Sequence, residues 1–166
     1  MSSNNYLPHL VILPEDEADA KIAHGFTLNL QINQRAIQVL PYAGGWKVVV
    51  GKFIKDHATK MRQYLERRFL LLIDFDKQLQ NRLPYIQNQI PENVRDRVFI
   101  LGVFSKPEKL GSALGKKLES IGEEIADNCE QNSNQFWQHD LLKHNQAELE
   151  RMIADVKPFL FAHGKA

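Results

Sequence analysis

Four short, continuously apolar runs stand out along the chain. They span residues 9–13, 36–40, 69–73 and 97–103, and the third is the most hydrophobic stretch of the sequence. Runs of this length without in-out alternation are typical of strands that are buried on both faces. The pattern therefore predicts four strands in a sheet that other elements cover on both sides.

The segments between these runs read as helices, at residues 17–30, about 46–67 and about 77–89. The first of them carries apolar residues at roughly helical spacing. These are Ala20, Ile22, Ala23, Phe26 and Leu30. Regular alternation of strand and helix predicts parallel strands joined by right-handed crossovers. We therefore expect a three-layer α/β/α fold with a four-stranded, mostly parallel sheet.

The last third of the chain is predicted to be helical. One segment runs from residue 110 to about 129 and is interrupted by Gly115 and Gly122, and another spans 136–161 and breaks near Pro158. The second segment carries an apolar stripe of the kind that packs on a domain or on a partner. The stripe comprises Trp137, Leu141, Leu142, Leu149, Met152, Ile153 and Val156.

A length of 166 residues suits one domain. We expect a single domain over 1–166, with an α/β core at about 9–112 and a helical extension at about 113–166. The extension lies outside the predicted α/β core and is the candidate element for oligomerisation or for binding another protein.

Composition and charge narrow the function only slightly. Hydrophobic residues make up 43% and charged residues 25%, and 21 basic against 20 acidic residues give a net charge of +1. This balance leaves nucleic acid open as a partner but excludes a strongly basic footprint. The polar N-terminus is not a signal peptide, and no apolar run reaches a membrane span, so we expect a cytoplasmic protein without a membrane partner. Cys129 is the only cysteine, which excludes an internal disulfide and favours a structural thiol.

Acidic residues follow two of the predicted strands. Glu15 comes directly after the first strand, and Asp74 and Asp76 end the third. Ligands bind outside the carboxyl ends of the strands in an open parallel sheet, and an Asp-x-Asp spacing in an extended segment points both carboxylates to one side. If these strands are neighbours, the three carboxylates converge and require a hard cation such as Mg²⁺. Asp16 and Glu17 are more simply explained as acids at a helix N-terminus.

This arrangement resembles a Toprim domain, the module of topoisomerases, bacterial primases and OLD-type nucleases. That family has a glutamate after its first strand, usually followed by a glycine and then by an acid four residues on. Glu15 and Asp19 match these acids, whereas Asp16 replaces the glycine. Asp74 and Asp76 match the family's Asp-x-Asp at the end of the third strand. The resemblance covers about residues 9–112 and implies a Toprim/Rossmann-like fold.

Two further features are similar to the OLD-type version of this domain. A Gly-Gly-Lys-like turn opens its second helix, and Gly44 and Gly45 followed by Trp46 and Lys47 occupy that place here. OLD-type members also place a glutamate after the fourth strand, for which Glu108 is the candidate.

The resemblance implies Mg²⁺- or Mn²⁺-dependent phosphodiester chemistry on nucleic acid. Glu15 would act as general acid/base or metal ligand, and Asp74 and Asp76 as ligands, with Asp19 and Glu108 as further ligand candidates. Gly44, Gly45, Lys47 and Lys106 are the candidates for contact with phosphate or nucleic acid. OLD-type nucleases carry an ATPase domain, but this sequence has no phosphate-loop motif, so any ATPase would be a separate protein.

Two other functions fit part of the pattern. Response-regulator receiver domains have an acidic pair after strand one, a phosphorylated aspartate after strand three and a later lysine-proline pair. Glu15 with Asp16, then Asp74, then Lys106 are similar to these. The interval between Asp74 and Lys106 holds only one clear strand, however, and two crossovers do not fit there. The other alternative is a non-catalytic α/β binding module.

Overall fold

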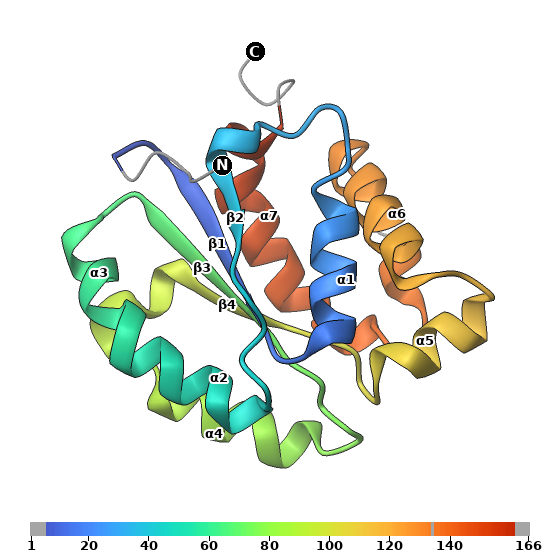
Figure 1. The fold of residues 1–166 in the computed structure, drawn as a ribbon, viewed down its shortest axis with the longest axis horizontal. Helices are drawn as coiled ribbons and strands as arrows, with labels where there is room; N and C mark the ends of the chain where they lie inside the picture. The colour runs from blue at the N-terminus through green and yellow to red at the C-terminus, as the bar shows by residue number, and fades with distance from the viewer. Residues whose placement is uncertain (1–5, 134, 162–166) are drawn as a thin grey trace.

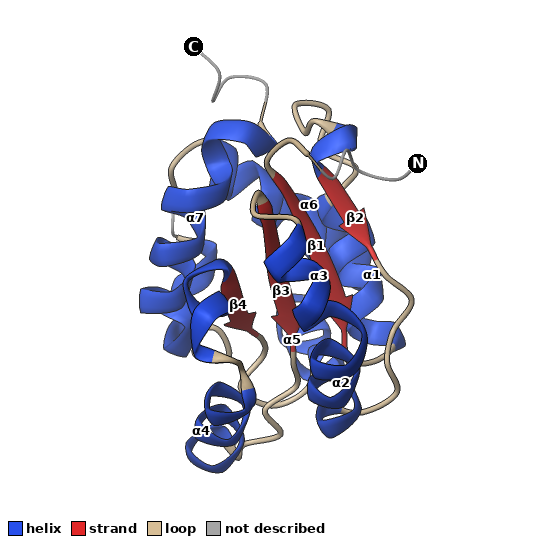
Figure 2. Ribbon diagram, turned by 90° about the vertical axis from the view of Figure 1, so that its left-hand side faces the viewer, coloured by secondary structure: helices blue, strands red, loops and turns tan. Residues whose placement is uncertain are grey.

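The computed structural model describes residues 6–133 and 135–161, and its centre is one sheet of four parallel strands. The strands are β1 (His9–Pro14), β2 (Ile37–Val39), β3 (Arg67–Leu72) and β4 (Val98–Leu101). Their order is β2-β1-β3-β4, and all arrows point the same way in Figure 2. The expected α/β fold with a four-stranded parallel sheet is confirmed.

The strand order creates a switch point at the carboxyl ends of β1 and β3. These strands pair along their whole length, from His9 opposite Arg67 to Pro14 opposite Leu72. The chain leaves β1 toward β2 on one side and leaves β3 toward β4 on the other. In open α/β sheets, ligands bind in the crevice where the connections diverge in this way.

Helices cover both faces of the sheet (Figure 1). One face carries α1 (Glu17–Phe26), α6 (Leu118–Glu130) and α7 (Gln146–Leu160). The other carries α2 (Trp46–Lys52), α3 (Ala58–Gln63) and α4 (Leu79–Gln89). Alternate residues of β1 are buried on opposite faces of the sheet. Leu10 and Ile12 pack in the core on the α1, α6 and α7 side, and Val11 and Leu13 pack in the core on the α2, α3 and α4 side. This explains why the strands read as continuous apolar runs.

The remaining elements are short. They are α5 (Pro107–Leu114), a π-helical turn at Phe53–His57, and 3₁₀ turns at Gln34–Ala36, Glu92–Arg97, Phe136–Gln138 and Lys143–Asn145. None of the helices in the described part of the chain is long and apolar enough to cross a membrane.

Several element boundaries differ from the sequence prediction. The helix expected over 46–67 ends at Gln63, because Tyr64 turns to an extended conformation and Arg67 already belongs to β3. Gly122 does not interrupt a helix. It lies inside α6 where that helix crosses α1 closely, and a Cβ there would come within 2.0 Å of the Ile22 carbonyl oxygen.

The C-terminal segment also differs from the single broken helix that was expected. Two 3₁₀ turns occupy its first part, and α7 continues through Pro158 to Leu160. A proline inside a helix removes one backbone hydrogen bond. Here the last turn persists because Val156 and Leu160 are buried against the sheet.

Side chains of this segment cover the free edge of β4. Asn145 bonds to both the N–H and the carbonyl oxygen of Gly102, at 3.1 and 2.9 Å. Glu148 Oε2 accepts from the Ile100 N–H at 2.9 Å. Arg151 donates to the Val98 carbonyl oxygen. An open sheet edge invites pairing with another chain, and this segment blocks it. The apolar stripe predicted here therefore packs on the domain's own core.

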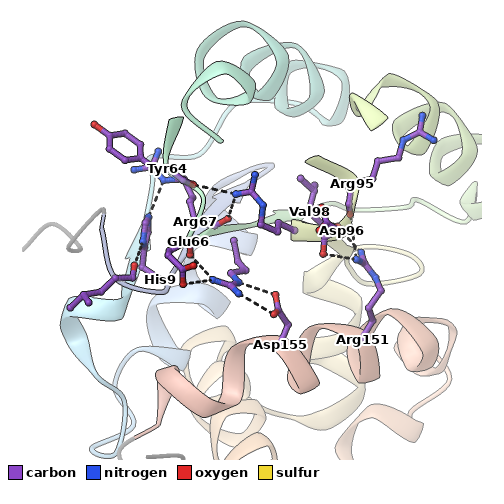
Figure 3. A network of polar contacts seen from close by, with 12 residues as sticks. His9, Tyr64, Glu66, Arg67, Arg95, Asp96, Val98, Arg151 and Asp155 are labelled. Carbon is purple, nitrogen blue, oxygen red and sulfur yellow. Dashed lines mark hydrogen bonds and ion pairs between the residues drawn. The ribbon is translucent and has the colours of Figure 1, made fainter. Parts of the chain in front are cut away.

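A polar network ties the amino ends of the strands together (Figure 3). Arg67 Nε donates to His9 Nε2 at 2.9 Å, and the other ring nitrogen of His9 bonds to the Leu7 carbonyl oxygen. Arg68 pairs with Asp155 of α7 at 3.0 Å. These groups lie at the opposite end of the sheet from the acidic residues, so they stabilise the fold at a distance from the candidate site.

Candidate metal centre

Glu15 and Asp74 meet at the switch point between β1 and β3. Glu15 directly follows β1, and its N–H donates to the Leu72 carbonyl oxygen at 2.9 Å. Its Oε1 accepts a hydrogen bond from the Asp74 N–H at 2.9 Å. The parallel pairing of the two strands thus places these two acids side by side, as their positions after neighbouring strands require.

Asp16 joins the same group. Carboxylate oxygens of Glu15, Asp16 and Asp74, one from each residue, all lie within 4.8 Å of one another. Asp16 is also the N-cap of α1, where its Oδ1 accepts from the Asp19 N–H at 3.1 Å. The capping role inferred from the sequence is therefore present, and the same carboxylate belongs to the acidic group.

Asp19 approaches this group from the first turn of α1. It is 1% exposed and Asp74 is 5% exposed. Both carboxylate oxygens of Asp19 and Oδ1 of Asp74 are buried and receive no hydrogen bond from any N–H group in the described residues. The two carboxyl groups lie close enough to share a hydrogen bond with each other, which requires a proton on one of them. A buried carboxylate without a donor is costly, so each of these atoms requires either a proton or a cation.

The same burial shifts the pKa values. Loss of solvent raises the pKa of Asp74 to about 8, with a further upward contribution from the charge of Glu15. Burial raises the pKa of Asp19 well above its ordinary value, and the charge of Asp74 acts in the same direction. Burial also raises the pKa of Glu15. In the metal-free protein the Asp19–Asp74 pair therefore retains a proton near neutral pH.

The donor set fits a hard divalent cation. All the converging ligand atoms are carboxylate oxygens, which suit Mg²⁺ or Mn²⁺ rather than softer metals. Glu15, Asp16 and Asp74 supply the converging oxygens and could thus hold such an ion. Asp19 is not among the described carboxylates that converge, and it lies beside Asp74 as a buried neighbour of the group.

Asp76 lies outside this group. The chain is not extended after Asp74, because Asp76 adopts a left-handed conformation with φ of 49°. Its N–H donates to the Ser105 carbonyl oxygen at 3.0 Å, and its carboxylate lies 3.6 Å from Arg82 Nη2. The Asp-x-Asp spacing predicted two carboxylates on one side, but that geometry holds only in an extended segment.

Arg82 was not identified from the sequence. Its Nη1 donates to the Asp74 carbonyl oxygen at 2.7 Å, and its guanidinium lies 4.9 Å from the Trp46 ring centroid. The residue comes from α4, across the turn that follows β3. No spacing rule links an arginine on the following helix to a carbonyl before that turn, so the sequence held no signal for it.

The remaining candidates are spread around the carboxyl end of the sheet. The Gly44 N–H donates to the Glu15 carbonyl oxygen at 2.8 Å, and Gly45 is the N-cap of α2. Lys47 is exposed, with its ammonium group near Trp46.

Lys106 and Glu108 lie at the start of α5. Both are exposed, and Lys106 is the N-cap residue of that helix. Glu108 is not among the described carboxylates that converge. Cys129 is buried, which raises the pKa of its thiol to about 12 and supports a structural role.

Comparisons with known proteins add no relative. No protein-family model, curated protein or solved structure matches this chain.

Proposed function

We propose that this chain binds Mg²⁺ or Mn²⁺ through Glu15, Asp16 and Asp74 and uses the ion in phosphodiester chemistry on nucleic acid. The observation that carries the metal site is the convergence of carboxylate oxygens from these three residues, within 4.8 Å of one another, at the switch point of the sheet. The nucleic-acid substrate is supported by the resemblance of the acidic pattern to Toprim domains.

The residues divide into two roles under this proposal. Asp16 and Asp74 act as ligands, and the buried Asp19 contacts Asp74 from the first turn of α1. Glu15 is oriented by its hydrogen bond from the Asp74 N–H, and burial raises its pKa, which is the direction that a proton-transferring carboxyl group needs. A bound metal would polarise a phosphoryl oxygen and stabilise the charge that develops on it. Arg82 neutralises Asp76 and fixes the backbone of Asp74.

Titration calorimetry tests the metal site directly. Mg²⁺ and Mn²⁺ are titrated into the unmodified protein and into Glu15→Gln, Asp74→Asn and the matched control Glu108→Gln, an exposed acid on α5. We expect binding by the unmodified protein and the control, and loss of binding by the two site variants. Absence of binding by the unmodified protein, or equal binding by all four proteins, would reject the site.

A cleavage assay then tests the chemistry. Labelled single-stranded and duplex DNA and RNA are incubated with protein and Mn²⁺ or Mg²⁺, and products are resolved by length. We expect cleavage that is lost in Glu15→Gln and kept in Glu108→Gln. Metal binding without turnover on any of these substrates would leave the domain a non-catalytic binding module and reject the nuclease proposal.

A receiver-like role for Asp74 is the second candidate. The closeness of Glu15, Asp16 and Asp74 favours it, since an acidic pair beside a phosphoacceptor is the receiver arrangement. Against it, Asp74 is 5% exposed, which obstructs the approach of a phosphodonor. Incubation with acetyl phosphate and Mg²⁺ distinguishes the two, because only the receiver-like role adds a phosphoryl mass that is absent from Asp74→Asn.

A further inference from the structure

An aromatic pair lies beside the candidate metal centre. Trp46 opens α2 and Tyr85 lies on α4, and their rings meet edge to face with centroids 5.3 Å apart. Tyr85 is 41% exposed, and Trp46 is partly exposed. The ammonium group of the exposed Lys47 lies 5.4 and 5.5 Å from the two ring centroids. The surface thus combines two aromatic rings with a positive charge.

A single guanidinium group connects this pair to the acids. Arg82 Cζ lies 4.9 Å from the Trp46 ring centroid, while Arg82 Nη1 donates to the Asp74 carbonyl oxygen at 2.7 Å. The loop before α2 is attached to the same place, because the Gly44 N–H donates to the Glu15 carbonyl oxygen at 2.8 Å. The aromatic pair is therefore fixed within the reach of one nucleotide from the metal centre.

The chemistry of this surface matches an unpaired nucleobase. Aromatic side chains stack on bases of any sequence, and neighbouring lysines attract the phosphates. Lys47 contacts the rings from an exposed position, where a cation–π contact is weak, so a stacking base can displace its ammonium group toward a phosphate. Bases inside a duplex already stack on one another and cannot use such a surface.

We propose that Trp46, Tyr85 and Lys47 form a subsite for one unpaired base of a single-stranded nucleic acid, next to the metal centre. This inference rests on the proposed function for its substrate class, nucleic acid, and adds that the substrate is single-stranded next to the metal centre. The rings bind the base and Lys47 binds an adjoining phosphate. Arg82 contacts both the Trp46 ring and the Asp74 carbonyl oxygen and so fixes the position of the ring relative to the acidic group.

Tyr85 is the residue to change, because Trp46 also packs on the core of its layer. Tyr85→Leu keeps an apolar side chain and removes the ring, whereas Tyr85→Phe restores the ring. Tyr6→Leu is the matched control. Tyr6 is also exposed and also meets a second ring, that of Tyr64, but both precede the strands at the far end of the sheet.

The assay is fluorescence anisotropy of a labelled single-stranded oligothymidylate of about 12 nucleotides, a length that suits one single-strand site. A blunt-ended duplex with the same number of base pairs is the duplex probe. Both probes are measured with the full chain in EDTA and again in Ca²⁺. We expect tighter binding of the single strand in at least one condition, with Trp46 fluorescence quenched on binding. Tyr85→Leu should weaken single-strand binding by about 5- to 100-fold, and Tyr85→Phe and Tyr6→Leu should bind normally.

Two results would overturn the inference. One is equal or tighter binding of the blunt-ended duplex by the unmodified protein in both conditions. The other is single-strand binding that Tyr85→Leu leaves unchanged. Neither result depends on metal binding or cleavage. If Tyr85→Leu still cleaves nucleic acid and binds the single strand with unchanged affinity, this subsite is rejected and the proposed function is kept. If the protein binds no metal but Tyr85→Leu still weakens single-strand binding, the proposed metal site is rejected and the base subsite is kept.

Discussion

Asp74→Asn should stabilise the metal-free protein, whereas most substitutions at buried positions destabilise. Asp74 is buried against Asp19, and burial raises its pKa to about 8 from an ordinary value of 3.8. Near neutral pH the native state therefore keeps a proton on this carboxyl pair that the unfolded chain has released. Asparagine keeps the shape of the side chain, offers an amide N–H to Asp19 and needs no proton.

The difference between the folded and unfolded pKa values of Asp74 sets the size of the expected gain in stability. Each pKa unit corresponds to about 1.4 kcal/mol, so a rise from 3.8 to about 8 limits the cost to about 6 kcal/mol. Asp19 shares the proton, so we expect a gain in the free energy of unfolding of about 1–3 kcal/mol at about pH 8. A pKa raised by folding gives stability that is complete below the unfolded pKa and is lost as the pH rises toward the folded pKa. The advantage of the variant should therefore grow with pH between about 4 and about 8.

Urea unfolding in EDTA, repeated at several pH values across this window, measures the effect. The unmodified protein, Asp74→Asn and the control Asp76→Asn are compared at each pH. Asp76 is more exposed and pairs with Arg82, so its replacement removes a neighbouring carboxylate and leaves the buried Asp19–Asp74 pair in place. An Asp74→Asn variant that is less stable than the unmodified protein at about pH 8, or a difference that does not change with pH, would refute the reasoning.

Three further outcomes follow from the same geometry. Millimolar Mg²⁺ should raise the melting temperature of the unmodified protein at about pH 8 but not that of Asp74→Asn, since only a ligand bound to the native state stabilises it; equal shifts in scanning calorimetry would contradict this. Gly102→Ala should destabilise the protein by more than about 3 kcal/mol in urea unfolding, because a Cβ there would lie 1.6 Å from the Ile73 carbonyl oxygen. His9 is buried and accepts from Arg67, and burial lowers its pKa, so the stability contributed by its neutral imidazole should be lost as the pH drops below 6.5. His9→Asn should therefore lose less stability than the unmodified protein when the pH drops below 6.5, and an identical pH profile of the two proteins in urea unfolding would exclude the assignment.

The sequence predicted the parts of the site that strand position determines. Continuous apolar runs identified four strands buried on both faces, and Glu15 and Asp74 follow two of them. Because parallel neighbours end at one edge, the sheet brings these two acids together, within hydrogen-bonding distance through Oε1 and N–H. The prediction depended only on β1 and β3 being neighbours, and they are.

The sequence could not predict what the turn after β3 does. Asp76 and Lys77 both adopt left-handed conformations, with φ of 49° and 62°. Their N–H groups are held by the carbonyl oxygens of Ser105 and Phe104, which come from the segment after β4. A conformation set by partners so distant in the chain leaves no local signal. The same holds for Arg82, whose contact with the Asp74 carbonyl oxygen depends on where this turn delivers α4.

The distribution of satisfied and unsatisfied polar groups supports a site at the carboxyl end of the sheet. At the amino end, His9, Arg67 and Arg68 are fully engaged by partners. Of the six buried side-chain nitrogen and oxygen atoms without a partner in the described residues, four belong to Asp19, Asp74 and Arg82. Native proteins satisfy nearly all buried polar atoms, so a concentration of exceptions in one place needs a cause. Packing alone does not supply it, because asparagine in place of either aspartate would fill the same space without a charge. A proton on the Asp19–Asp74 pair lowers this cost in the metal-free protein. Under the proposed function a cation held by Glu15, Asp16 and Asp74 replaces that proton, so metal binding and loss of the proton should occur together.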